Sequence, residues 1–215
     1  IYAAIIALAQ TDMKRLIAYS SFSHMGVIAV GLFTLTPEGI DGAIFQMLSH
    51  GVIITALFFC VAAVSWRAET RSIDAFSGVA HKMPVLATLG MLFVMANIGL
   101  PGTGAFVGEW LVMVGAIHVS FWIAFLAGSS MILGAVYMLV LYRRVMFGAP
   151  GRGVVAMLRD LTGPELAVLV PCALVTPWMG IHPGSFLRVF DPAAAHARSA
   201  PAAQAPAAPI PSAAR

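Results

Sequence analysis

Apolar residues fill this chain in long runs, and short polar stretches separate the runs. About twenty consecutive apolar residues are enough for a helix to cross a bilayer. The pattern therefore predicts an all-α, polytopic transmembrane helix bundle. We expect spanning helices over about Lys14–Leu35, Asp41–Trp66 and Phe121–Met146, a last span that ends near Gly180, and the end of another helix over Ile1–Ala9.

Capping and turn residues mark where several of these helices begin. Thr11-Asp12 is expected to cap the helix that follows it, and Thr36-Pro37-Glu38-Gly39 to form the next turn. Thr162-Gly163-Pro164-Glu165 fits a capping box with proline in the first turn. Arg67–Lys82 is expected to be a polar connection with one short surface helix, and Phe147–Leu161 a glycine-rich, basic loop.

The composition supports a membrane protein and excludes a water-soluble domain. The chain is 60% hydrophobic and 10% charged, with a net charge of +3, whereas soluble domains carry about 25% charged residues. The basic residues gather at the ends of apolar segments, as membrane topology requires, so no nucleic-acid partner is expected. We expect one transmembrane domain over residues 1–190, with about five full spans and the end of another, and a disordered Ala/Pro-rich tail over 191–215. Because Ile1–Gln10 has the pattern of a helix already under way, the chain is expected to be the C-terminal part of a longer protein.

The apolar stretch from Met83 to His118 is too long for one straight crossing. Its roughly 36 residues would measure about 54 Å as a helix, against a hydrocarbon core of about 30 Å. If the stretch crosses once, nine of the 12 basic residues lie on one side, in agreement with the positive-inside rule. If it crosses twice, this bias disappears. We therefore expect one crossing by a discontinuous helix, broken around Gly99–Gly104, with the basic side in the cytoplasm.

Glu109 is the one acidic residue, of nine in the chain, that falls in the interior of an apolar segment; the other eight lie at segment ends or outside them. A charged carboxylate at that depth costs at least ~2.5–3.5 kcal/mol. It also follows the predicted helix break within two turns, and broken helices recur where transporters bind ions. These features favour a group that binds and releases a proton. The structural alternative is a protonated carboxyl that only forms a hydrogen bond with a neighbouring helix.

His24 and His50 also fall near the middle of predicted spans. Ser20 lies one turn before His24, and Gln46 one turn before His50, so each histidine belongs to a small polar patch. Histidine can pass a proton between its two ring nitrogens. The alternative for each is a helix–helix hydrogen bond. Zinc binding is a weaker alternative, because neither histidine has a second ligand at i+3 or i+4.

Other candidate groups carry less weight. Lys14 begins a helix at the basic side, where it would either anchor the topology or line a water path for protons. Cys60 and Cys172 have no ligand clusters around them, so neither a metal site nor a disulfide is expected. The sequence has no phosphate-binding loop, dinucleotide fingerprint or haem ligand pair, and no cofactor or redox centre is expected in this chain.

Three motifs resemble one known family. Residues Gln10–Gly26 (QTDMKRLIAYSSFSHMG), Gln46–Gly51 (QMLSHG) and Gly99–Glu109 (GLPGTGAFVGE) are similar to the antiporter-like membrane subunits of the proton-translocating NADH:quinone oxidoreductase, respiratory complex I. Within that family the third motif is most similar to subunit M, the bacterial relative of mitochondrial chain 4. Subunit L has lysine where this chain has Glu109. The resemblance covers about residues 1–190.

The resemblance implies a subunit of fourteen transmembrane helices, of which this chain would hold the last five and part of the ninth. It implies that His24 and His50 belong to a central polar axis, and that Glu109 ends this axis and communicates with the outer face. The glutamate and two lysines of the family's first half-channel lie in earlier helices, so this chain alone is not expected to pump protons.

The function expected from residues and resemblance together is proton translocation in the bacterial inner membrane. Glu109, His24 and His50 would form the relay, with FMN, iron–sulfur clusters and quinone in partner subunits. Neighbouring antiporter-like membrane subunits, lipid and protons would be the partners. Two alternatives stay open: an Mrp-type cation/proton antiporter subunit or the related subunit of an energy-converting hydrogenase, and a purely structural scaffold.

Overall fold

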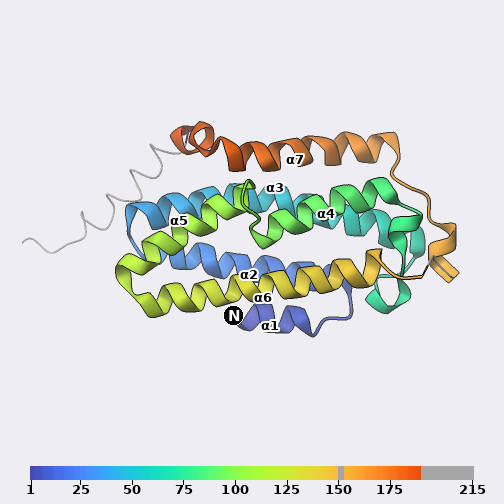
Figure 1. The fold of residues 1–215 in the computed structure, drawn as a ribbon, viewed down its shortest axis with the longest axis horizontal. Coiled ribbons are helices and arrows are strands. Elements are labelled where there is room, and N and C mark those ends of the chain that lie inside the picture. The colour runs from blue at the N-terminus through green and yellow to red at the C-terminus, as the bar shows by residue number, and fades with distance from the viewer. Residues whose placement is uncertain (150–152, 190–215) are drawn as a thin grey trace, which may run out of the picture.

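The chain is a bundle of helices that run along one common axis (Figure 1). The computed structural model describes residues 1–149 and 153–189, and every regular element of those residues is helical. The predicted all-α transmembrane bundle is therefore confirmed, while the tail expected over 191–215 lies outside the described residues. The helices are α1 (Tyr2–Leu8), α2 (Met13–Phe33), α3 (Pro37–Ala68), α4 (Pro84–Ile98), α5 (Gly104–Val119), α6 (Phe121–Met146) and α7 (Gly163–Ile181), with 3₁₀ turns η1 (Ile73–Ala75), η2 (Val79–His81) and η3 (Gly153–Met157).

The expected discontinuous helix is also confirmed. α2, α3, α6 and α7 are long and apolar enough to span a membrane, whereas α4 and α5 are each shorter. α4 fills one half of the bundle's length and α5 continues in the same direction through the other half (Figure 1). The start of α2, the end of α3, the start of α4, the end of α6 and the start of α7 therefore share one end of the bundle. This is the end at which the basic residues gather.

Some predicted boundaries shift. Asp12 caps α2 by accepting hydrogen bonds from the backbone of Lys14 and Arg15, and Thr162 with Glu165 forms the expected capping box. The prediction of a turn at Thr36–Gly39 is wrong, because this segment begins α3. The Thr36 side chain accepts a hydrogen bond from the Gly39 amide, and Pro37 fits the first helical position. The connection Arg67–Lys82 holds two 3₁₀ turns, η1 and η2, in place of one surface helix.

The helix break is built from two local motifs. Gly99 adopts a left-handed conformation after α4, with φ of 85°, and the Gly99 and Leu100 amides donate to Ala96 and Met95. This is a Schellman arrangement, which ends helices and favours glycine. A type II turn follows, since Gly102 has φ of 93° after Pro101, and the Thr103 amide donates to the Leu100 carbonyl. Proline and two glycines thus end α4 and start α5 without leaving these three amides unpaired.

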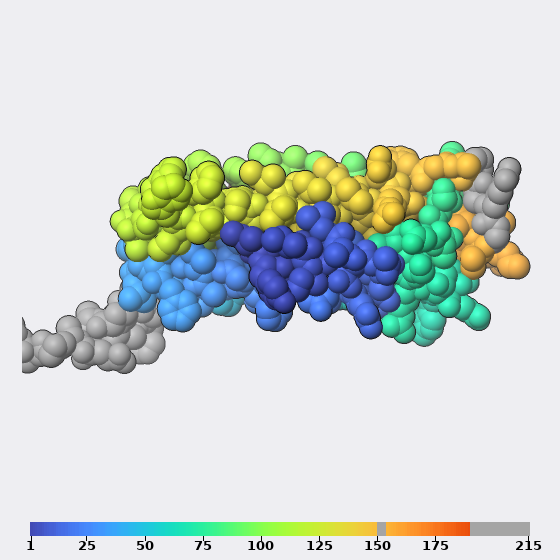
Figure 2. Space-filling view, turned by 90° about the horizontal axis from the view of Figure 1, so that it is seen from below, coloured from blue at the N-terminus to red at the C-terminus, as the bar shows by residue number. Residues whose placement is uncertain are grey.

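The core differs along the bundle. A large apolar cluster joins α4 to α2, α3 and α6, with Phe93 and Leu86 of α4 fully buried in it. The N-terminal residues lie over α2 and α6 on one face, dark blue beside the yellow α6 in Figure 2. In the α5 half the apolar cluster is small, formed mainly by Val27, Ile28 and Val112 with Ala43. Polar side chains and glycines fill the remaining space between α5 and α3, which positions the candidate site.

Candidate functional site

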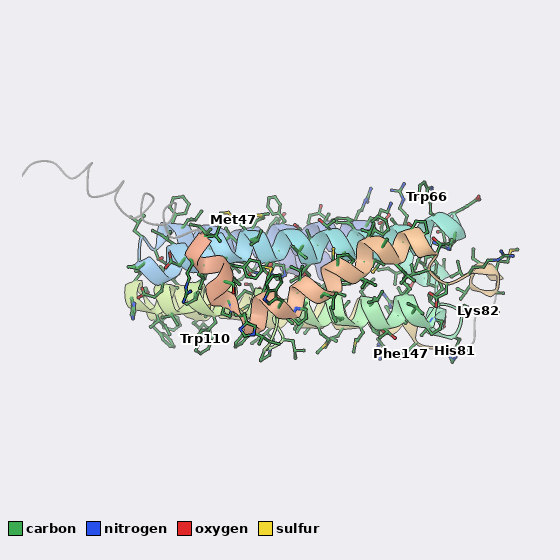
Figure 3. The ribbon with its side chains drawn as sticks, turned by 90° about the horizontal axis from the view of Figure 1, so that it is seen from above. Met47, Trp66, His81, Lys82, Trp110 and Phe147 are labelled. Carbon is green, nitrogen blue, oxygen red and sulfur yellow. The ribbon has the colours of Figure 1, made fainter. Side chains whose placement is uncertain are left out.

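Glu109 is buried in the bundle, with 1% of its surface exposed. Its Oε1 atom lies 3.0 Å from Nδ1 of His24 and accepts a hydrogen bond from Nε2 of Gln46 at 3.2 Å. The three side chains come from α5, α2 and α3. Figure 3 shows Met47 of α3 and Trp110 of α5, the sequence neighbours of Gln46 and Glu109, on the outside of the bundle. These two helices therefore direct an apolar residue outward beside each buried polar residue.

Glycines allow this close approach of α5 to α3. A Cβ atom on Gly108 would lie 2.6 Å from Oε1 of Gln46 and 2.9 Å from its Cα. One turn earlier, a Cβ atom on Gly104 would lie 2.6 Å from Oγ of Ser49. Small residues at such positions let membrane helices pack backbone against backbone. Gln46 can therefore reach Glu109 because Gly108 has no side chain.

The break forms the other wall of the carboxyl site. A Cβ atom on Gly99 would lie 2.7 Å from Oε2 of Glu109. The left-handed φ of Gly99 already favours glycine, and contact with the carboxyl group excludes a side chain for a second reason. The residue that ends α4 is thus also the residue against which Glu109 packs.

His50 extends the polar group toward α2. The rings of His24 and His50 lie 5.0 Å apart, centroid to centroid, with an interplanar angle of 37°. Nε2 of His50 lies 2.8 Å from Oγ of Ser21. His24 and His50 are 6% and 2% exposed. The three residues selected from the sequence, Glu109, His24 and His50, therefore form one continuous cluster that crosses α5, α2 and α3.

Several polar atoms of this cluster have no hydrogen-bond partner within residues 1–149 and 153–189. Most buried polar groups in proteins are paired, and an unpaired one requires an explanation. In a membrane such groups are tolerated inside protein or beside water-filled space. The atoms are Nε2 of His24, Oε1 of Gln46, Oδ1 of Asn97 and Oε2 of Glu109. Among these atoms, Nε2 of His24 and Oε2 of Glu109 belong to titratable groups and have a lone pair free to accept a proton.

Lys14 does not join this cluster. It lies in the first turn of α2, ten residues and about 15 Å before His24. There it lines a cavity of about 620 Å³ with Ser65, Glu69 and Arg71. Any role of Lys14 would be at the basic end of the bundle.

Asn97 and Tyr137 are polar residues of the site that the sequence did not single out. Both are 1% exposed, and both donate a hydrogen bond to Oγ of Ser20, at 3.1 and 3.2 Å. The position of Asn97 directly before the helix break could have identified it. Tyr137 lies in a long apolar run, and the sequence does not indicate which neighbouring helix a tyrosine in such a run contacts.

The fold, the break and the buried polar axis define a class of antiporter-like membrane subunits. Residues 1–134 match the family described as NADH:quinone oxidoreductase/Mrp antiporter, TM. The chain belongs to this family and is a multi-pass membrane protein.

Individual relatives show which subunit of this family the chain resembles. The chain is 46% identical to NADH-quinone oxidoreductase subunit M of Rhodobacter capsulatus, over 91% of this chain and 38% of that protein. The predicted similarity to subunit M is confirmed, and the chain spans 38% of that relative's length.

Solved structures share the fold. A chain of respiratory complex I from Thermus thermophilus matches with a TM-score of 0.86 and 36% identity, over 92% of this chain and 42% of that chain. A chain of the Mrp complex from Dietzia sp. DQ12-45-1b matches with a TM-score of 0.81 at 18% identity, over 93% of this chain and 44% of that chain. The second match shows the fold alone.

Proposed function

We propose that this chain belongs to a proton-translocating membrane subunit of NADH:quinone oxidoreductase, and that His50, His24 and Glu109 relay the proton. The observation that carries the proposal is the contact between Nδ1 of His24 and Oε1 of Glu109, at 3.0 Å and shielded from solvent. An acid and an imidazole at hydrogen-bond distance can exchange a proton. The similarity to subunit M supplies the process in which this exchange would take part.

The geometry supports a defined order of transfer. His24 directs Nδ1 to Glu109, and its Nε2 has no partner in the described part of the chain. A proton that arrives on Nε2 can be matched by release of the Nδ1 proton to Glu109, because imidazole uses both nitrogens. His50, whose ring lies beside that of His24, is the neighbouring group from which the proton comes. Glu109 is the terminal group, and its Oε2 is free of protein hydrogen bonds within the described residues.

Energy for transfer would come from outside this chain. In the proposed complex, FMN, iron–sulfur clusters and quinone in partner subunits carry the electrons, and neighbouring antiporter-like subunits contact this one. The basic end of the bundle would face the cytoplasm of a bacterial cell, in agreement with the positive-inside rule. Lys14 would lie there, at the edge of a water path into the bundle.

Replacement of Glu109 by Gln in the intact complex tests the proposal. The amide keeps the shape of the carboxyl group and can still meet Gln46, but it cannot bind and release a proton near neutral pH. We expect an assembled complex that oxidises NADH and translocates fewer protons per electron. The proton-to-electron ratio of reconstituted vesicles measures this, and an unchanged ratio would remove Glu109 from the relay.

A subunit of an Mrp-type cation/proton antiporter is the second candidate, favoured by the fold match to the Mrp complex. Its 18% identity is well below the 46% of subunit M. The neighbouring genes separate the two functions. Genes for NADH-binding and iron–sulfur subunits beside this one would support the first, and a set of antiporter genes alone would support the second.

A further inference from the structure

Ser20, Asn97 and Tyr137 form a second buried polar cluster, next to the proton-relay residues but outside the order of transfer given above. Their side chains come from α2, α4 and α6, and each is 1% exposed. Oγ of Ser20 accepts hydrogen bonds from Nδ2 of Asn97 at 3.1 Å and from the hydroxyl of Tyr137 at 3.2 Å. One oxygen therefore ties together three helices at the level of the break.

Two of the three helices that contact Glu109, α2 and α4, each carry a member of this cluster. On α2, Ser20 lies one turn before His24, which contacts Oε1 of the carboxyl group. On α4, Asn97 lies two residues before Gly99, where an added Cβ atom would lie 2.7 Å from Oε2. The hydrogen bond from Asn97 to Ser20 thus sets how closely the end of α4 approaches α2. Glu109 lies between His24 of α2 and Gly99 at the end of α4.

From this placement we propose that Ser20, Asn97 and Tyr137 are positioning residues for Glu109, with Tyr137 as the group that fixes the cluster to α6. They hold the C-terminal end of α4 against the carboxyl group, so that Oε1 stays within reach of His24. None of them exchanges the proton itself. The proposal rests on the proposed function, because the position of Glu109 matters to activity only if Glu109 carries protons.

The short length of α4 makes such a tether necessary. α4 ends at Ile98, inside the bundle, and its last residues lack the continuous backbone hydrogen bonds that would hold an unbroken helix in register. Apolar packing in a membrane is weakly directional, because lipid is as apolar as the helix surface. Hydrogen bonds to Ser20 give the end of α4 one defined position. Without them the end can shift, and Gly99 shifts with it.

The chain offers a matched control for Tyr137. Tyr142 lies on the same helix, is 8% exposed, and donates one hydrogen bond of 2.8 Å to the Ala87 carbonyl of α4. Each tyrosine therefore joins α6 to a neighbouring helix through one hydroxyl, Tyr137 to α2 and Tyr142 to α4. They differ in place: Tyr142 meets the first half of α4, and Tyr137 lies beside the break.

The test compares Tyr137→Phe, Ser20→Ala and Tyr142→Phe in the intact complex. Each change deletes one buried hydroxyl and keeps most of the side-chain volume. The proton-to-electron ratio is measured, together with the infrared carboxyl band of Glu109, which the Glu109→Gln variant identifies by its loss. One neutral hydrogen bond corresponds to about a fivefold change in population, enough to move both readouts. We expect both Tyr137→Phe and Ser20→Ala to lower the ratio and shift the band, and Tyr142→Phe to change neither.

Three results would overturn the positioning role. The first is a wild-type ratio and band in Tyr137→Phe. The second is equal loss in Tyr137→Phe and Tyr142→Phe, which would show general destabilisation. The third is loss in Tyr137→Phe with a wild-type Ser20→Ala, which would show that the tyrosine acts without the cluster. If Glu109→Gln keeps the wild-type ratio, the proposed function fails. If Glu109→Gln lowers the ratio but the Tyr137 and Ser20 variants keep the wild-type ratio, only the positioning role fails.

Discussion

The two halves of the broken helix are packed by different means. α4 buries Leu86, Phe93 and Val94 in the large apolar core. α5 buries three glycines and Glu109 along the face that meets α3. The first half is held mainly by side-chain volume, with hydrogen bonds at Asn97 and Ala87, and the second by close backbone contact and hydrogen bonds. The half of the broken helix with little apolar packing, α5, is thus the half that carries the ionisable group.

This difference has a physical reason. A carboxyl group at membrane depth needs hydrogen-bonding partners close by, since lipid offers none. Glycines on α5 bring the backbone of α3 near enough for Gln46 to reach Glu109. Large apolar residues at those positions would separate α5 from α3 and remove the hydrogen bond from Gln46 to the carboxyl group. The break therefore divides a supporting segment from a segment built around chemistry.

The largest effect on stability is expected from Phe93→Ala in α4. Phe93 is fully buried in the apolar core, and large-to-small changes of this kind cost up to about 3–5 kcal/mol. We expect a lower midpoint of thermal unfolding for the complex, measured by loss of assembly on heating. The proton-to-electron ratio of the remaining assembled complex should stay at the wild-type value. A lowered ratio would show that the apolar packing of α4, and not only its hydrogen bond to Ser20, positions Glu109.

A smaller effect is expected from Gly108→Ala in α5, with Gly90→Ala in α4 as its control. The new Cβ at position 108 would meet Gln46 at 2.6–2.9 Å, whereas the one at position 90 would find its nearest atom, Cε of Met146, at 3.9 Å. Overpacking costs about 1–3 kcal/mol. In contrast, alanine stabilises a helix interior by up to about 1 kcal/mol relative to glycine.

Thermal stability and the proton-to-electron ratio are both expected to distinguish these two glycine variants. Gly108→Ala should lower both thermal stability and the proton-to-electron ratio, because Gln46 is displaced from Glu109. Gly90→Ala should keep the ratio and hold or raise stability. If the two variants behave alike, close backbone contact is not what distinguishes α5 from α4.

The broken helix and its buried ionisable residues could be predicted from the sequence. The length of the Met83–His118 stretch required two crossings or one broken crossing, and the charge distribution selected the broken one, since nine of 12 basic residues could share one side only in that way. Proline and glycine marked the break, and membrane depth selected Glu109, His24 and His50. These signals are local or compositional, so one chain is enough to reveal them.

The contacts between helices could not be predicted in this way. Which atom of His24 meets Glu109, or that Tyr137 reaches Ser20, depends on the rotation and spacing of three helices. The extra turn of α3 before Asp41 was missed because Thr36 and Pro37 suit both a turn and a helix start. Tertiary packing decides between such alternatives.

The smallest effect is expected from Asp160→Ala, which removes the cap of α4. The carboxylate of Asp160 accepts hydrogen bonds from the amides of Val85 at 2.8 Å and Leu86 at 3.2 Å, in place of a cap from within the helix. Loss of a cap costs about 0.5–2 kcal/mol. The first turn of α4 should then exchange its amide hydrogens faster, as measured by hydrogen–deuterium exchange and mass spectrometry. Amides beyond the break, from Gly104 onward, should exchange as in the wild type, because the Schellman motif and the type II turn separate the hydrogen-bond ladders of the two helices. Faster exchange in α5 would mean that the halves unfold as one unit, and the division between support and chemistry would then lie elsewhere than at the break.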